Sequence, residues 1–109
     1  MQLEYLDDNI RLCCLEPKKA VKALGTDAAK KLRTRLSDLK AASSVSELVA
    51  GRPHPYKGTN ERRFSLDLAG GKRLLFIPTA NPPPVKNDGG IDWRLVKEIT
   101  IVFIGDNHD

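Results

Sequence analysis

The chain has 109 residues and a formal net charge of +4, with 40% hydrophobic and 29% charged residues. This length supports one modest hydrophobic core and is too short for two, so we expect a single domain over residues 1–109. The composition excludes a disordered tail, and no apolar run approaches the length of a membrane span. Acidic residues in the first eight positions argue against a secretory signal, so we expect a cytoplasmic protein with no membrane partner.

The cysteines and the distribution of charge limit the kinds of ligand and partner that we expect. Cys13 and Cys14 are adjacent, a spacing that suits neither a redox pair nor a zinc site, and a disulfide between neighbours is strained. We therefore expect free thiols, buried or half-buried. The segment from Lys18 to Lys40 contains eight cationic residues and only two aspartates. This concentration favours a polyanion or an acidic protein as partner, although a solvated helix face gives the same pattern.

The first 25 residues alternate short elements. Residues 2–6 are expected to form a strand, and Asp7 or Asp8 then caps a helical turn. Proline suits the first position of a helix and glycine its end. The segment from Pro17 to Leu24 is therefore predicted to be a second helix, ended by Gly25.

The strongest helix signal follows at once. Thr26 or Asp27 is expected to be the N-cap, and apolar residues then recur at spacings of three and four. This stripe consists of Ala28, Ala29, Leu32, Leu36, Leu39 and Ala42. Ser44 and Glu47 next match the capping box, in which the two residues satisfy each other's free amides, so a further short turn is predicted.

After residue 51 the apolar pattern changes to period two, which predicts strands. Phe64, Leu66 and Leu68 alternate with Arg63, Ser65 and Asp67. A second strand is expected at residues 73–77, and a three-residue loop at 70–72 would pair Leu74 with Leu68. This register also places Arg73 and Asp67 together on the face turned away from the core, where a cation can meet an anion.

Residues 78–93 have no periodicity, and we expect a mobile hairpin loop there. The triple proline at 82–84 could be a polyproline ligand, but a solvated insertion is favoured. The last strand is expected at 98–104, with one face formed by Ile99, Ile101 and Phe103. The order of a strand, helices and three strands predicts an α+β fold with an antiparallel sheet packed on a helical pair.

The two histidines stand far apart in the sequence. His54 begins the segment His54–Gly58, and His108 lies in the final segment 105–109, each beside a cation or a carboxylate. Two imidazoles on a small basic domain are the minimum for metal-free cleavage of RNA, in which one group takes a proton from the 2'-hydroxyl and another protonates the leaving oxygen. The scattered spacing and the nearby cations argue against a metal site, so we expect neither a metal nor a cofactor.

With these elements in place, the chain resembles the HigB-type toxins of the RelE/ParE superfamily, a group sometimes named killer suppression proteins. The likeness covers nearly the whole chain. It is carried by Leu24-Gly25, residues 28–36, His54–Gly58, Phe64–Leu66, Arg73–Phe76 and Gly105–His108. The resemblance implies a RelE/ParE-like α+β fold, with an N-terminal strand and a helical pair packed on a twisted antiparallel sheet of three to four strands.

The resemblance also implies a function. Such a protein is the toxin of a type II toxin–antitoxin system and enters the ribosomal A site to cut the messenger RNA displayed there, until a helix-turn-helix antitoxin covers it. His54 and His108 would be the acid and base, and Asp106 would orient His108 or share in proton transfer. Free of its antitoxin, the toxin is expected to be a monomer.

The resemblance assigns the substrate contacts as well. Lys57 and Arg73 would hold the scissile phosphate and offset its growing charge, with Arg63 as a weaker candidate for the same surface and Tyr56 as an aromatic that could stack at the site. The family usually ends in Asp-Tyr-His, whereas this chain has Asn107 at the middle position. Asparagine cannot stack on a base, but it can hydrogen-bond to a base edge or a sugar, so cleavage at a reduced rate or with altered preference is expected.

Two other classes of function stay open. The first is a gyrase-directed toxin of the same superfamily, which needs no histidine pair; the presence of His54, Lys57, Arg73 and His108 together favours the nuclease. The second is a protein without catalysis, either an inactivated toxin that still binds its antitoxin or a nucleic-acid-binding regulator. Among the remaining aromatics, Phe64 and Trp93 are better explained by packing than by a role at the site.

Overall fold

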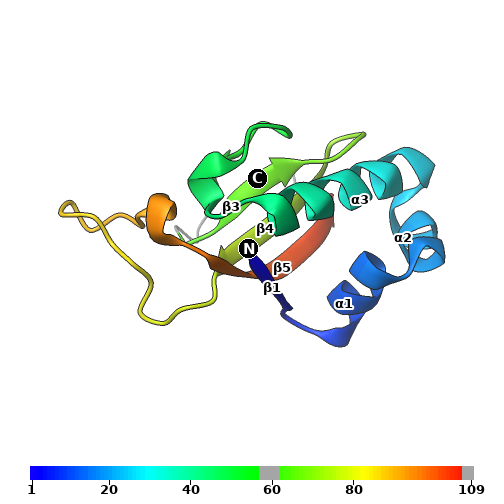
Figure 1. Ribbon diagram of the computed structural model, residues 1–109. Helices are drawn as coiled ribbons and strands as arrows, with labels where there is room; N and C mark the ends of the chain where they lie inside the picture. Colours follow the sequence, from blue (N-terminus) through cyan, green and yellow to red (C-terminus); the bar gives the residue numbers. More distant parts are fainter. Residues whose placement is uncertain (57–61, 107–109) are drawn as a thin grey trace.

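The computed structural model describes residues 1–56 and 62–106, and these ranges hold three α-helices and five strands (Figure 1). In chain order the helices and strands are β1 (Gln2–Tyr5), α1 (Asp8–Leu15), α2 (Pro17–Leu24), α3 (Thr26–Ala41), β2 (His54–Pro55), β3 (Phe64–Asp67), β4 (Lys72–Pro78) and β5 (Glu98–Asp106). The α+β class is therefore confirmed. None of the helices in the described ranges is long and apolar enough to cross a membrane.

The five strands form one mixed sheet in the order β1-β5-β4-β3-β2. β1 runs parallel to β5, whereas the other neighbours pair in antiparallel fashion. The expected antiparallel sheet of three to four strands is thus wrong in two respects, because β1 joins it in parallel and the two residues of β2 add a fifth strand. A parallel pair needs a long connection back to the same end of the sheet, and everything from α1 to β4 lies between β1 and β5.

Local signals explain where the helices begin and end. The Asp7 carboxylate accepts a backbone hydrogen bond of 2.9 Å in the first turn of α1, which confirms it as the N-cap. Pro17 lies in the first turn of α2, and Gly25, with φ +86°, ends that helix. Gly25 is also the N-cap of α3, so the expectation of a cap at Thr26 or Asp27 is wrong by one or two residues.

The short turn expected after α3 is a 3-10 turn, η1 (Val45–Glu47). Its capping box is not formed as predicted. The Ser44 side chain makes no capping hydrogen bond, and Glu47 accepts a 2.6 Å hydrogen bond from the backbone of Ser43 instead. The turn therefore uses its glutamate to satisfy an amide, but one residue earlier than the pattern indicates.

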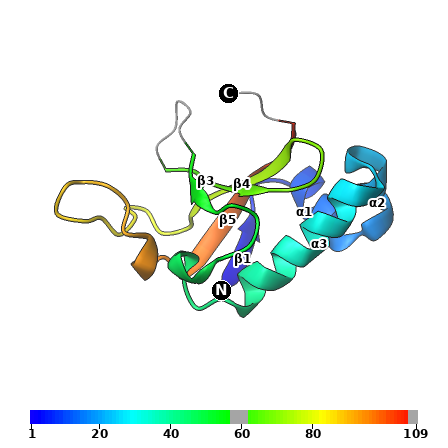
Figure 2. The same ribbon diagram turned by 90° about the horizontal axis from the view of Figure 1, so that it is seen from above.

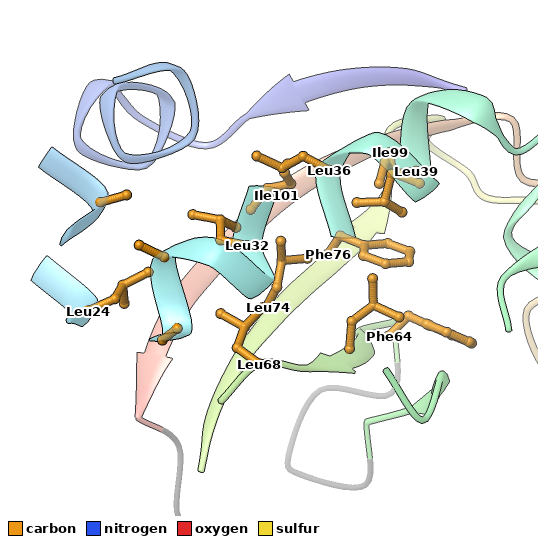
Figure 3. Close-up of a cluster of buried hydrophobic side chains, with 14 of the residues drawn as sticks. Leu24, Leu32, Leu36, Leu39, Phe64, Leu68, Leu74, Phe76, Ile99 and Ile101 are labelled. Carbon is orange, nitrogen blue, oxygen red and sulfur yellow. The ribbon is translucent and has the colours of Figure 1, made fainter. Parts of the chain in front are cut away.

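The core lies between α3 and one face of the sheet (Figure 3). The predicted stripe of α3 packs against apolar side chains that alternate along β3, β4 and β5. Its fully buried members include Leu32, Leu39, Leu66, Leu74, Phe76, Ile99 and Ile101. Trp93, in the 3-10 turn η2 (Trp93–Leu95), extends this core, since its ring centroid lies 4.8 Å from that of Phe64. The packing roles expected for Phe64 and Trp93 are therefore confirmed.

The β3–β4 hairpin has the expected faces but a different register. Its three-residue loop is Ala69–Gly71, one residue earlier than predicted, and Leu74 consequently pairs with Leu66. A shift of two residues leaves every side chain on its own face of the sheet. Arg73 therefore lies directly opposite Asp67, and the predicted meeting of cation and anion on the uncovered face is confirmed.

β5 departs from simple alternation. Ile101 pairs with Phe76 in the core, but Phe103, two residues on, pairs with Leu75, only one residue along β4. Such a β-bulge reverses which face the following residues occupy. Ile104 packs against the core and Phe103 does not, so the prediction that Phe103 shares the face of Ile101 is wrong. The aromatic ring lies on the other side of the sheet.

The connection between β4 and η2 is irregular apart from one isolated bridge, between Val85 and Ile91. Residues 86–90 of this connection are nevertheless held together by a backbone hydrogen bond, in which Lys86 N donates to Gly90 O at 2.7 Å. Residues 79–92 thus form an irregular loop that folds back on itself, and the mobility expected for residues 78–93 stays a prediction.

Candidate functional site

The candidate site lies on the face of the sheet turned away from the helices. All three helices lie on one side of the sheet, and no helix of the described ranges covers the other (Figure 2). We call the side without helices the open face, although Ser65 and Leu75 on it are fully buried. One cross-strand row on it consists of His54, Ser65, Leu75 and Phe103, and the next row consists of Asp67, Arg73 and Gly105. The strands are about 4.8 Å apart, so these rows bring together segments distant in sequence.

Asp67 is the centre of an ion-pair cluster on the open face. Its carboxylate accepts hydrogen bonds from Arg52 Nε at 2.8 Å and from Arg52 Nη2 at 3.4 Å, and Arg73 Nε lies 3.9 Å away. The hydrogen bond to Asp67 raises the pKa of the Arg52 guanidinium further above its usual value. The side chains of Asp67 and Arg73 are only 33% and 25% exposed, so both are more ordered than a fully solvated pair. Asp67 thereby fixes two arginines.

The segment before β2 is attached to the end of β3 through its backbone. Gly51 O accepts from Asp67 N at 2.7 Å, and Arg35 of α3 donates from Nε to Asp67 O at 3.1 Å. Gly51 has φ +87° and Arg52 has φ +50°, a left-handed pair of residues. Glycine is required at position 51, because a Cβ there would collide with the Arg35 side chain. Arg52 adopts a backbone conformation that non-glycine residues disfavour, and its bond to Asp67 holds it there.

This backbone geometry sets the protonation pattern of His54. His54 Nδ1 lies 2.6 Å from Arg52 O. A carbonyl oxygen only accepts hydrogen bonds, so Nδ1 must carry the hydrogen. In the neutral ring, Nε2 then has its lone pair free, which is the form a general base needs. Neither the role of Arg52 nor that of Gly51 was foreseen from the sequence, since no local pattern there indicates a contact with α3.

Two buried polar atoms on the open face have no hydrogen-bond partner among the residues that the structure describes. They are Ser65 Oγ and Arg63 Nε. Ser65 is fully buried and pairs directly with His54, and Arg63, two residues earlier, has the same orientation by strand alternation. An unmade hydrogen bond of this kind costs about 1–3 kcal/mol, and such groups concentrate at functional sites. The hydroxyl of Ser65 is a feature that the sequence pattern alone did not mark.

Tyr56 is buried, and the exposed Asp106 lies on the helix side of the sheet. Tyr56 is 7% exposed, and its backbone N–H donates to Arg63 O at 2.8 Å, so its ring is covered. Asp106 pairs with Lys72 at the end of β5, where its carboxylate lies 4.0 Å from Lys72 Nζ. Asp106 also lines a hollow of about 250 Å³ with residues of α1, on the helix side of the sheet. The structure therefore does not bring Asp106 together with His54.

Three predicted site residues, Lys57, Asn107 and His108, lie outside the described residues. The described part of the candidate site is consequently His54, Arg63 and Arg73, joined by the residues that fix them. Within residues 1–56 and 62–106, no group of three or more histidine, cysteine, aspartate or glutamate side chains could hold a metal ion.

Besides the hollow beside Asp106, the helix side has a second concave surface. A groove of about 200 Å³ runs between the helices, lined in part by Cys13, Cys14, Val21, Lys30 and Arg33. Both cysteines are half-buried free thiols, as expected. Burial raises the pKa of the Cys14 thiol to about 12, so it is protonated at neutral pH and is not a nucleophile.

Comparisons with known protein families and with curated proteins give no match. The likeness to HigB-type toxins thus depends on the motifs quoted above.

Proposed function

We propose that this protein is a metal-independent endoribonuclease, the toxin of a type II toxin–antitoxin system, which cleaves messenger RNA on the ribosome. One observation carries the proposal. On one sheet face that no helix of the described ranges covers, the hydrogen bond from His54 Nδ1 leaves Nε2 as the basic nitrogen, and Arg73 forms an ion pair of 3.9 Å with Asp67. His54 is on β2 and Arg73 is on β4, and these strands are two apart in the sheet, roughly 10 Å. Along the strands the two residues are offset by two positions. One nucleotide and an arginine side chain can span this separation.

The arrangement supports the following chemistry. His54 Nε2 takes the proton of the 2'-hydroxyl as its oxygen attacks the adjacent phosphorus, and the bond to the 5'-oxygen breaks. Arg73 offsets the negative charge that grows on the non-bridging oxygens. In this proposal His108 supplies the proton to the departing 5'-oxygen, and Lys57 adds a second cation. Asp106 receives no step, because it pairs with Lys72 on the other side of the sheet.

The antitoxin is proposed to bind the helix side. The groove there is apolar at its floor and has Lys30 and Arg33 among its lining residues. Leu15 and Val21, nearby on α1 and α2, are 50% and 43% exposed. An apolar strip beside cations fits an acidic amphipathic segment, since apolar contacts give affinity and opposite charge gives orientation. The helix-turn-helix character of the partner is an expectation from the family resemblance.

The test is cleavage of messenger RNA on purified ribosomes, read by mapping 5' ends. His54→Ala should lower the cleavage rate at least 100-fold, as expected for loss of a general base. Arg73→Ala should lower it by a similar factor. Arg11→Ala is the matched control, because Arg11 pairs with Asp8 on α1 as Arg73 pairs with Asp67, but away from the open face. Asn107→Tyr should raise the rate if the missing phenol limits the enzyme.

Two outcomes would replace the proposal. If translated messages stay whole in expressing cells while DNA-damage signalling rises, the protein is a gyrase-directed toxin. If His54→Ala and His108→Ala leave growth inhibition unchanged while Lys30→Glu and Arg33→Glu abolish partner binding, the protein is a binding module without catalysis. The first result separates two toxins of one superfamily, and the second separates an enzyme from an interaction domain.

A further inference from the structure

The bulge in β5 presents an aromatic ring on the open face. Phe103 pairs with the fully buried Leu75 and is itself only half-buried. Its ring extends along the strand toward Gly105, since a Cβ on Gly105 would lie 3.6 Å from Phe103 Cζ. Without the bulge, this phenylalanine would face the core with Ile101. The irregularity in β5 therefore has a consequence for the surface as well as for packing.

Gly105 allows this ring to lie next to a cation. It is the cross-strand partner of Arg73, and because it has no side chain, the Phe103 ring can lie over its backbone. Phe103 and Arg73 are diagonal neighbours on adjacent strands, which places their Cα atoms about 7–8 Å apart. The result is an aromatic ring over the Gly105 backbone, beside the residue that carries the guanidinium.

The charge of this face selects an anion. Arg52, Arg63 and Arg73 lie around Asp67 at the β2–β4 end of this face, whereas Glu4 and Glu98 lie at its far end, on β1 and β5. Arg63 Nε and Ser65 Oγ, both buried, add two hydrogen-bonding groups that no described residue satisfies. A ligand with a flat ring and a negative group matches all of these features. A nucleotide of a single-stranded RNA is such a ligand.

We propose that Phe103 is the stacking surface for one base of the bound RNA, with the adjoining phosphate at Arg73. The choice of RNA as ligand rests on the proposed function. The other aromatics near the sheet are less suited, because Tyr56 and Phe64 are buried, and the half-buried Tyr5 and Trp93 pack against the core on the helix side. Stacking on a phenylalanine tolerates every base, so Phe103 contributes affinity and position rather than sequence preference.

The experiment measures binding of a fluorescein-labelled hexaribonucleotide to the full-length protein by anisotropy at low salt. Phe103→Leu keeps the apolar bulk without the flat ring, and Phe103→Tyr keeps the ring. Phe103→Leu should weaken binding roughly tenfold, whereas Phe103→Tyr should match the unmodified protein. Equal binding by Phe103→Leu and the unmodified protein would overturn the proposal, as would an equal loss in both variants, which indicates packing.

A second measurement keeps the inference testable if Phe103→Leu is poorly folded. In the unmodified protein, an abasic residue at one position of the hexamer should cause the same tenfold loss, and in Phe103→Tyr it should do so again. No loss at any position of the hexamer overturns the stacking role. Ribosomal cleavage is measured in parallel. Ring-dependent binding without cleavage refutes the nuclease and keeps the stacking site, and cleavage without ring-dependent binding does the reverse.

Discussion

The two faces of the sheet are built from the same strands, but different interactions hold their side chains in place. On the helix side, Leu66, Leu74 and Phe76 are fully excluded from solvent. On the open face, the residues between them include Asp67 and Arg73, which take part in hydrogen bonds and ion pairs. Period-two alternation places a core residue and a site residue next to each other in the chain. Stability and candidate chemistry are therefore separable by single substitutions.

The faces are also linked at one point. Arg35 is a buried residue of α3, yet it donates to the carbonyl of Asp67, whose carboxylate lies on the open face. Through Asp67 and Arg52, this bond from the helix layer reaches the carbonyl that fixes His54. Residues 51–52, which we call the rim of the open face, therefore hold Asp67 and His54 in position. A substitution at the rim should disturb the whole candidate site.

The largest expected effect on stability comes from a comparison of substitutions at two neighbouring residues of β4, Leu74 and Arg73. Leu74→Ala should lower the free energy of unfolding by about 2–5 kcal/mol, because it opens a cavity in a fully buried site. Arg73→Ala removes a partly exposed ion pair and should cost about 1 kcal/mol or less. Urea denaturation of both variants checks the difference. Comparable losses would show that the open face contributes to stability as much as the core does.

The link at residue 51 can be broken on its own. Gly51→Ala places a Cβ against the Arg35 side chain and strains a φ of +87°, so it should cost roughly 2–4 kcal/mol and reduce cleavage by displacing Arg52 and His54. Gly89→Ala is the control, since its φ is +88° and a Cβ there meets nothing within 4 Å. It should cost only about 1–2 kcal/mol and leave cleavage intact. Equal losses of stability in thermal denaturation would exclude the collision with Arg35.

A smaller change in stability is expected from Asp67→Asn. The amide still accepts a hydrogen bond from Arg52 but no longer neutralises two guanidinium groups, so the free energy of unfolding should fall by about 1 kcal/mol or less. Cleavage should slow roughly tenfold, since Arg73 and the segment that fixes His54 both lose their anchor. Asp88→Asn, in an exposed pair with Lys86, should change neither quantity. A cleavage rate unaffected by Asp67→Asn would separate the ion-pair cluster from catalysis.

The sequence predicted what depends on local spacing. The apolar stripe of α3 and the faces of Leu66 and Arg73 follow from periods of 3.6 and two, and the structure confirms them. Features set by distant contacts could not be predicted. The bulge that turns Phe103 outward depends on pairing with β4, and the residues of β5 that pair with β1 lie 96 positions further along the chain.

The same limit applies to the candidate site. The meeting of Arg73 with Asp67 followed from strand alternation, whereas the contact of Arg52 with His54 depends on left-handed backbone beside α3. Gly51-Arg52 has no local signature of that conformation beyond its glycine. Sequence reasoning therefore found which charged residues share a face, and missed the rim that positions them.

A last prediction tests the helix side alone, through pH. Burial, with a contribution from Cys13, raises the pKa of the Cys14 thiol from about 9 to about 12 in the folded protein. Above pH 9 the unfolded chain releases this proton while the folded protein retains it, so the stability that depends on the neutral thiol is complete below pH 9 and is lost as pH rises toward 12. Cys14→Ala should flatten the fall in unfolding free energy between pH 9 and pH 10.5, measured by urea denaturation at each pH. Cys13→Ala leaves the more deeply buried thiol in place and should keep most of the slope. Because arginines stay charged throughout this range, a slope unchanged by Cys14→Ala would mean that the alkaline sensitivity arises from lysine or tyrosine groups and not from burial in the helix layer.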